Sequence, residues 1–152
     1  MAPAGPVLFD LERFVVAQRN GVHEQALAEL RAGRKSSHWI WFVFPQVAGL
    51  GRSGTSRFYA IASLGEALAY LAHPILGPRL GECVDALLAL PANLDVEAIL
   101  GGIDAMKLRS SMTLFLRADP GELRFVAVLD RYFAGVPDPA TDRILAGLEA
   151  RG

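Results

Sequence analysis

Only one segment of this 152-residue chain has the residue types of a β-strand, and a single strand has no partner with which to build a sheet. The segment is the aromatic and β-branched run at residues 39–44 (WIWFVF). Its alternative conformation is a short buried helix that is capped by Ser36 or Ser37 and ended by Pro45. We predict the helix, because the patterns on both sides of the run are helical.

Helix start signals recur along the rest of the chain. Short polar side chains stand where they can accept a hydrogen bond from a free backbone N–H, and Gly33 and Gly135 are typical helix ends. Ser63 with Glu66 and Asp119 with Glu122 have the spacing of capping boxes. The other predicted caps are Asp10, Asp95, Asp104 and Asp138, and the predicted helices cover residues 11–17, 22–32, 64–73, 79–90, 96–101, 105–117, 120–133 and 139 onward.

These signals predict an all-α fold, a compact single-domain bundle of about seven to nine helices over residues 1–152. We expect residues 1–8 to be a loose N-terminal segment. Hydrophobic residues make up 52% of the chain, which excludes a disordered protein. The formal net charge of −1 argues against a general nucleic-acid or membrane-surface binder.

Several further expectations follow from what the sequence lacks. The start of the chain has no basic segment ahead of an apolar run, and the longest uncharged stretch, residues 36–51, is too short to cross a membrane. We therefore expect a cytoplasmic protein without membrane contact. The single cysteine, Cys83, and the three scattered histidines predict no disulfide, no metal site and no cofactor. Nucleic-acid binding would have to use Arg31, Arg34, Lys35 and Arg52, and we do not expect it.

The charges are distributed unevenly. Residues 30–65 contain no Asp or Glu but five Lys or Arg residues. This segment includes the sequence GLGRSG at 49–54, which has the G-x-G-x-x-G spacing of a dinucleotide fingerprint but no strand before it and no long helix after it. Glycine turns can instead point backbone N–H groups at an anion, with Ser53 and Arg57 as further donors. The alternatives are a flexible turn and a solvated basic loop.

Lys107 is the second candidate anion-binding group. The chain has 13 arginines and only 2 lysines, so a lysine inside a predicted helix is unusual here. Lys107, Ser110 and Ser111 have the spacing of one helical face. Such a group could bind phosphate or carboxylate, or could activate a serine. Alternatively, Lys107 pairs with an acid such as Asp104, and the serines lie at a helix contact.

Several motifs occur along the chain, and the longest are residues 37–46 (SHWIWFVFPQ), 57–59 (RFY), 70–74 (YLAHP), 76–80 (LGPRL), 110–115 (SSMTLF) and 138–141 (DPAT). Together with the glycine turn that contains Ser53 and the pair Asp104 and Lys107, they resemble the motifs of a family of bacterial proteins called "domain of unknown function 1810", some of which have a calpastatin-like label. The resemblance covers almost the whole chain. It implies a mostly or wholly helical protein and no established activity.

We therefore expect a polar cleft between the glycine turn and the Lys107 helix that binds a small anionic metabolite bearing a phosphate or a carboxylate. Arg57 and Lys107 would supply charge, and His38 or His73 any proton transfer. The sequence leaves open whether a reaction takes place. The alternative function is a non-catalytic helical module for protein–protein interaction. The candidate ligand-binding residues are His38, Gln46, Ser53, Arg57, Tyr59, His73, Lys107, Ser110 and Ser111.

Overall fold

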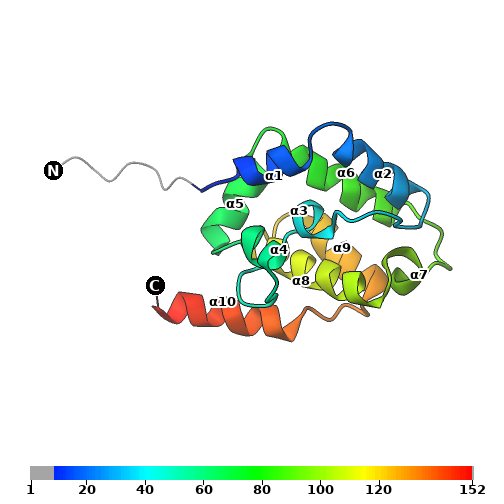
Figure 1. Cartoon of the computed structure of the whole chain (residues 1–152). Coiled ribbons are helices and arrows are strands. Elements are labelled where there is room, and N and C mark those ends of the chain that lie inside the picture. The colour runs from blue at the N-terminus through cyan, green and yellow to red at the C-terminus, as the bar shows by residue number, and fades with distance from the viewer. Residues whose placement is uncertain (1–8, 152) are drawn as a thin grey trace.

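The computed structural model describes residues 9–151, which form ten helices and no β-strand (Figure 1). The all-α prediction is confirmed, and the number of helices lies just above the expected seven to nine. Residues 1–8, predicted to be a loose segment, lie outside the described residues. The helices are α1 (Glu12–Ala17), α2 (Val22–Arg31), α3 (Ile40–Val43), α4 (Gly54–Phe58), α5 (Leu64–Ala72), α6 (Leu76–Leu88), α7 (Val96–Leu100), α8 (Gly102–Ala118), α9 (Leu123–Tyr132) and α10 (Pro139–Arg151).

The aromatic run at residues 39–44 forms the short helix α3, as predicted. The predicted caps Ser36 and Ser37 are wrong, because Trp39 is the N-cap residue and no side chain caps the helix. Both serines instead donate to the buried carboxylate of Glu29, at 2.6 Å from the Ser36 backbone N and 2.5 Å from the Ser37 Oγ. This contact fixes the loop that leads into α3.

Three predicted caps are confirmed by hydrogen bonds. Ser63 accepts from the backbone N of Glu66 at 3.1 Å, Asp95 from that of Ala98 at 2.7 Å, and Asp138 from that of Thr141 at 3.0 Å. Each of these bonds satisfies an N–H that a helix start would otherwise leave unpaired. Local sequence is therefore enough to define the starts of α5, α7 and α10.

Three other predicted caps are wrong. Helix α1 begins after Leu11 rather than after Asp10. Helix α9 begins after Glu122 rather than after Asp119, and the carboxylate of Glu122 accepts from Arg124 N. Helix α8 begins after Gly101, whose φ of +84° suits glycine, so Asp104 lies inside the first turn. Helix α6 starts at Leu76, earlier than the predicted residue 79. Pro78 therefore lies in its first turn, where proline is tolerated because the N–H groups of a first turn have no intrahelical partner.

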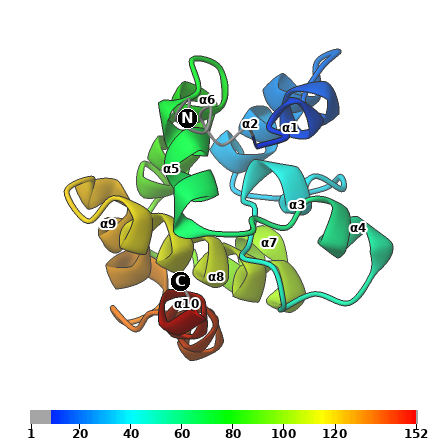
Figure 2. The ribbon, with the colours of Figure 1, turned by 90° about the vertical axis from the view of Figure 1, so that its left-hand side faces the viewer.

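Helix α8 forms the centre of the molecule. It contacts α3, α5, α7, α9 and α10, and Figures 1 and 2 show it between α5 above and α10 below. Its buried side chains occur nearly all round the helix, from Ala105 to Phe115. A helix that is covered on most sides has few positions open to solvent. The exposed side chains Ile103 and Met106 are therefore at one of the few open faces of α8.

The segment between α3 and α5 returns to its starting point through a small bridge. Ala48 N donates to Ile61 O and Ile61 N donates to Gln46 O, both at 2.8 Å. This pairing closes a loop that contains the glycine turn and α4. The loop is also held by Arg13 of α1, whose guanidinium donates to Phe58 O at 2.8 Å and lies 3.0 Å from the buried carboxylate of Glu66. The turn is therefore anchored at both ends.

No helix within residues 9–151 has both the length and the apolar content that crossing a bilayer requires.

Candidate functional site

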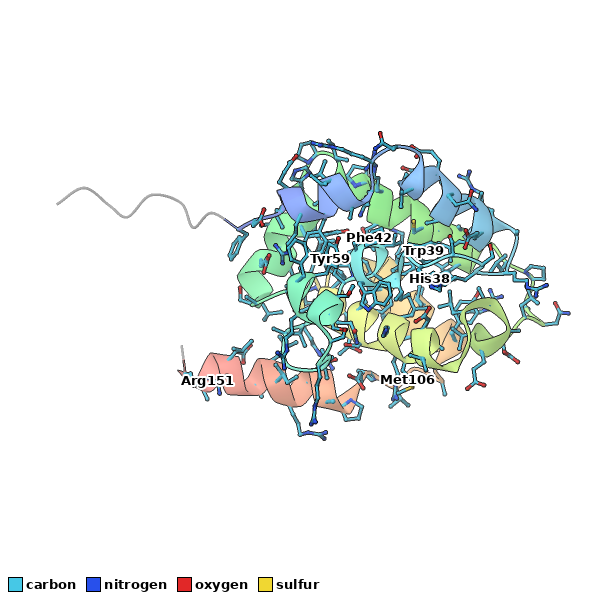
Figure 3. The ribbon with its side chains drawn as sticks, in the orientation of Figure 1. His38, Trp39, Phe42, Tyr59, Met106 and Arg151 are labelled. Carbon is cyan, nitrogen blue, oxygen red and sulfur yellow. The ribbon has the colours of Figure 1, made fainter. Side chains whose placement is uncertain are left out.

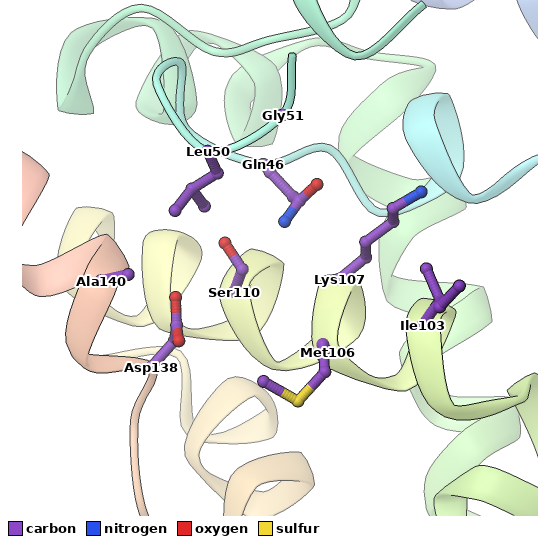
Figure 4. Close-up of a pocket in the computed structure, with 9 residues that line it drawn as sticks. All are labelled: Gln46, Leu50, Gly51, Ile103, Met106, Lys107, Ser110, Asp138 and Ala140. Carbon is purple, nitrogen blue, oxygen red and sulfur yellow. The ribbon is translucent and has the colours of Figure 1, made fainter. Parts of the chain in front are cut away.

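The glycine turn, α8 and the start of α10 surround a pocket with a volume of about 420 Å³ (Figure 4). The volume is within the range of small-molecule sites in proteins. Three segments that are far apart in the sequence supply its walls. The lining residues are Gln46, Leu50, Gly51, Ile103, Met106, Lys107, Ser110, Asp138 and Ala140.

Glycine is required where the turn forms the pocket wall. A Cβ at Gly51 would lie 2.3 Å from the Cβ of Ser56, so no larger residue fits against α4 at this position. Gly49 has a φ of +106°, and a Cβ there would lie 3.3 Å from Ile144 of α10. The first two glycines of the G-x-G-x-x-G sequence therefore let the turn close against α4 and α10. Within residues 9–151 no strand precedes the turn, so the G-x-G-x-x-G sequence lacks the strand–turn–helix context of a dinucleotide fingerprint.

Lys107 supplies the positive charge of the pocket. Its ammonium lies 4.9 Å from the ring centre of Trp41 and 3.8 Å from Asp104 Oδ1. The other oxygen of Asp104 forms a closer ion pair with Lys35, at 2.8 Å. Two lysines thus share one carboxylate, and Lys107 is the more distant partner. Its ammonium keeps hydrogen-bond donors for a further anion, since –NH₃⁺ has three.

A network of hydroxyl groups and a carboxylate lies on another side of the pocket. Asp138 Oδ2 accepts from both the backbone N and the Oγ1 of Thr141, at 3.0 Å and 2.5 Å. The Ser110 and Thr141 hydroxyls are 2.8 Å apart. Asp138 N donates to Thr113 Oγ1 at 2.8 Å, which fixes the residue against α8. Ser110 and Asp138 are both buried, with 2% and 8% of their surface exposed.

The pocket therefore has two polar parts of opposite charge. Figure 4 shows Asp138 and Ser110 next to each other, with the Lys107 ammonium pointing away from them. The other walls are largely aliphatic, from Leu50 of the turn and Ile103 of α8. The hydroxyl of Ser110 has Thr141 as its hydrogen-bond partner among the described residues, so the lysine does not activate the serine here. A pocket with a cationic part, an anionic part and aliphatic walls is suited to binding a small molecule.

The structure places three of the nine predicted site residues in the pocket: Gln46, Lys107 and Ser110. Ser111, although adjacent to Ser110, is fully buried and its Oγ has no hydrogen-bond partner within residues 9–151. It therefore faces the packed interior. Successive helical residues are about 100° apart, which separates the two serines.

The other five predicted residues do not line the pocket. Ser53 caps α4 by accepting from Ser56 N at 3.1 Å, and His73 accepts from Ile75 N and Leu76 N through its Nδ1 at the start of α6. Tyr59 packs against aromatic rings, 5.4 Å from that of Phe42. Arg57 is exposed on α4, and His38 is exposed next to Trp39 before α3 (Figure 3).

Sequence reasoning missed most of the pocket wall. Leu50, Ile103, Met106 and Ala140 carry no polar signal, and Asp138 was identified only as a helix cap. The available signal for Asp138 was its position within the motif at residues 138–141. A cap residue that also faces a pocket has the same sequence pattern as an ordinary cap. The two differ in whether the second carboxylate oxygen faces a pocket, and this depends on how the helices pack.

Comparisons with known proteins identify one family and one similar structure. A family described as "Protein of unknown function (DUF1810)" matches residues 8–145. The crystal structure of the conserved hypothetical protein Rv1873 from Mycobacterium tuberculosis is 50% identical in sequence and has a TM-score of 0.88. The alignment covers 91% of this chain and 97% of that chain. None of the curated proteins matches this chain. Because the family match extends over most of the sequence, this chain belongs to the DUF1810 family, whose function is unknown.

Proposed function

We propose that the pocket between the glycine turn, α8 and α10 binds a small organic anion, and that Lys107 recognises its negative charge. The observation that carries the proposal is the position of the Lys107 ammonium beside a pocket of about 420 Å³, with its carboxylate neighbour at 3.8 Å. Asp104 is already paired with Lys35 at 2.8 Å. An anion in the pocket would therefore give Lys107 a closer partner than it has within the protein.

The surrounding charges support this assignment. The pocket wall formed by Gln46, Leu50 and Gly51 belongs to the segment without acidic residues, so this wall does not repel an anion. The ring of Trp41 holds the ammonium at 4.9 Å, which restricts its position. A lysine held in one place loses less conformational entropy when it binds a ligand than a free surface lysine does.

The walls indicate what the rest of the ligand is like. The sequence suggested a polar cleft, but Leu50, Ile103, Met106 and Ala140 give this pocket an aliphatic character. A ligand with a hydrocarbon body would cover the exposed side chains of Ile103 and Met106. This use of the two side chains supports the pocket over the alternative of a protein-docking module, because both belong to the pocket wall.

The proposal is tested by calorimetry and thermal unfolding with a defined set of acids. The set contains straight-chain monocarboxylates of four to eight carbons and the monophosphate esters of the corresponding alcohols. We expect at least one acid to bind, and a ligand at 100 times its Kd to stabilise the protein by about 2.7 kcal/mol. Lys107→Met removes the charge and keeps an unbranched aliphatic side chain, and we expect it to weaken binding at least about tenfold.

Arg57→Gln is the matched control. It removes a positive charge that the sequence favoured as a ligand group but that lies outside the pocket, so binding should stay within about twofold of the wild type. Unfolding temperatures without ligand show that both variants fold. The proposal fails if no acid of the set binds, or if Arg57→Gln weakens binding as much as Lys107→Met does.

A further inference from the structure

We infer that the pocket selects acids that carry a second polar group, a hydroxyl or an ammonium, which donates a hydrogen bond to Asp138 and Ser110. This inference rests on the proposed function and adds the class of ligand. The Lys107 side of the pocket would bind the acid, and the Asp138 side would bind the donor. A hydrocarbon segment between the two groups would contact the aliphatic walls.

The direction of the hydrogen bonds shows what the Asp138 side can accept. The Thr141 hydroxyl has one hydrogen, and it is donated to Asp138 Oδ2 at 2.5 Å. The hydrogen between Ser110 and Thr141, which are 2.8 Å apart, must therefore come from Ser110. With its hydrogen used in this way, the Ser110 oxygen presents only lone pairs to the pocket. It can accept a hydrogen bond from a ligand but cannot donate one.

The carboxylate of Asp138 has the same preference. Its Oδ2 accepts both bonds from Thr141, and no donor within residues 9–151 forms a hydrogen bond with Oδ1. Asp138 is 8% exposed and lines the pocket, so its Oδ1 is open to the pocket rather than sealed inside the protein. A ligand that covers this oxygen without supplying a donor would leave a buried acceptor unpaired, which is costly and favours ligands that supply one.

Within residues 9–151, no basic side chain neutralises this carboxylate. Arg109 is close in sequence to Ser110, but its guanidinium donates to the carbonyls of Val136 and Pro137 at 2.8 Å and 3.0 Å. Asp138 forms no ion pair within the described residues. The N-terminus of α10 offsets part of its charge. The remaining negative potential repels a second anionic group and attracts a hydroxyl or an ammonium.

Gln46 is compatible with either end of such a ligand. Figure 4 shows its side chain extending into the space between Ser110 and Lys107, on the opposite wall from α8. An amide can donate and accept, so Gln46 does not determine the order of the ligand groups. The selectivity therefore depends on the contrast between Lys107, which only donates, and Asp138, which only accepts.

The test compares acids of equal length in the wild-type protein. For each chain of four to eight carbons, calorimetry gives the Kd of the plain carboxylate, the ω-hydroxy acid and the ω-amino acid, for example hexanoate, 6-hydroxyhexanoate and 6-aminohexanoate. We expect at least one acid with a donor group to bind about tenfold or more tightly than the plain acid of the same length. Equal Kd values at every length would overturn the inference but leave the proposed function intact. If none of the acids binds, the proposed function itself fails.

Asp138→Asn tests which residue accepts the donor. The asparagine oxygen can still cap α10 by accepting from Thr141 N, while its NH₂ group replaces the free acceptor with a donor. We expect the advantage of the hydroxy and amino acids to disappear and the plain acids to bind as well as before or better. Asp142→Asn is the matched control, since it removes a negative charge from the first turn of the same helix at a residue that pairs with Arg117.

Asp142→Asn should leave the advantage unchanged, and an equal loss in both variants would overturn the inference in favour of a long-range charge effect. Unfolding temperatures check that Asp138→Asn folds. Ser110→Ala provides a second variant that does not touch the cap of α10. It removes one acceptor, and we expect the advantage of the hydroxy acids to fall at least about threefold. An undiminished advantage in both Asp138→Asn and Ser110→Ala would show that the donor binds elsewhere.

Discussion

Two buried carboxylates of this protein, Glu29 and Asp138, are used in different ways. Glu29 Oε1 accepts from Ser36 N, Ser37 N and the indole of Trp39 at 2.6, 2.9 and 3.0 Å. Its Oε2 accepts from Gln25 and from the Ser37 hydroxyl at 2.8 and 2.5 Å. Asp138 uses only one oxygen, for Thr141. Neither residue has an ion-pair partner within residues 9–151.

The difference separates a structural role from a binding role. The donors of Glu29 come from α2 and from the loop before α3, so the carboxylate ties these segments together and keeps no capacity for a ligand. Asp138 also fastens two segments, α8 and α10, but one of its oxygens faces a pocket. A buried polar group that is fully satisfied inside the protein stabilises the fold, whereas unused capacity next to a pocket is available for recognition.

The largest effect is expected from removing the saturated carboxylate. Glu29→Ala leaves the buried indole N–H of Trp39 and the part-buried N–H groups of Ser36 and Ser37 without an acceptor, and each unsatisfied group costs up to about 1–3 kcal/mol. Because the loop can partly relax toward solvent, we expect the free energy of unfolding to fall by about 4 kcal/mol. Urea denaturation followed by circular dichroism measures the change.

Glu24→Ala on the same helix is the control for this variant. Glu24 is exposed, so its removal should change the free energy of unfolding by less than about 0.5 kcal/mol. Similar losses in Glu24→Ala and Glu29→Ala would mean that the hydrogen bonds of Glu29 do not contribute and that only helix propensity changed.

Acid should reproduce part of this loss in the unmodified protein. Burial alone would raise the pKa of Glu29, but the hydrogen bonds from Ser37, Ser36, Gln25 and Trp39 outweigh it and lower the pKa from 4.5 to about 2. Since the pKa in the folded state is below that of the unfolded state, the contribution is complete above pH 4.5. It is lost as the pH falls toward 2, and we expect it to amount to roughly 3 kcal/mol.

The measurement is urea denaturation between pH 6 and pH 2 for the wild type and Glu29→Gln. The variant cannot titrate at this position, so the stability difference between the two proteins should shrink across the window from pH 4.5 to pH 2. A difference that stays constant over this range would contradict the assignment of a low pKa to Glu29.

Some helix starts could be predicted from the sequence because their signals are local. The caps Ser63, Asp95 and Asp138 act on N–H groups three residues away, so local patterns were sufficient. Asp104 was misassigned because Gly101, with its φ of +84°, allows α8 to begin earlier. An aspartate in a first turn and an aspartate at a cap give similar sequence patterns.

The pocket was only partly predictable, for a physical reason. The sequence placed Lys107 opposite the glycine turn, and both do line one pocket. It could not place Asp138 there, because that depends on how α10 packs against α8. It also grouped Arg57 with Lys107 on charge alone. Arg57 lies in the loop that the bridge between Val47 and Ile61 closes, and this contact joins residues far apart in the chain.

The smallest effects come from the neighbouring serines of α8, which extend the comparison to two hydroxyl groups. Ser110 and Ser111 are both buried, but Ser110 bonds to Thr141 at 2.8 Å whereas the Ser111 Oγ has no partner in the described part of the chain.

Ser110→Ala should lower the free energy of unfolding by about 1 kcal/mol, because a hydrogen bond is lost. Ser111→Ala removes an unsatisfied group and should raise it by up to about 1 kcal/mol. The substitution and the helix are the same, so helix propensity cancels in the comparison. Thermal and urea denaturation of both variants measure the two changes, and a loss of equal size at Ser111 would mean that its hydroxyl has a partner in solution.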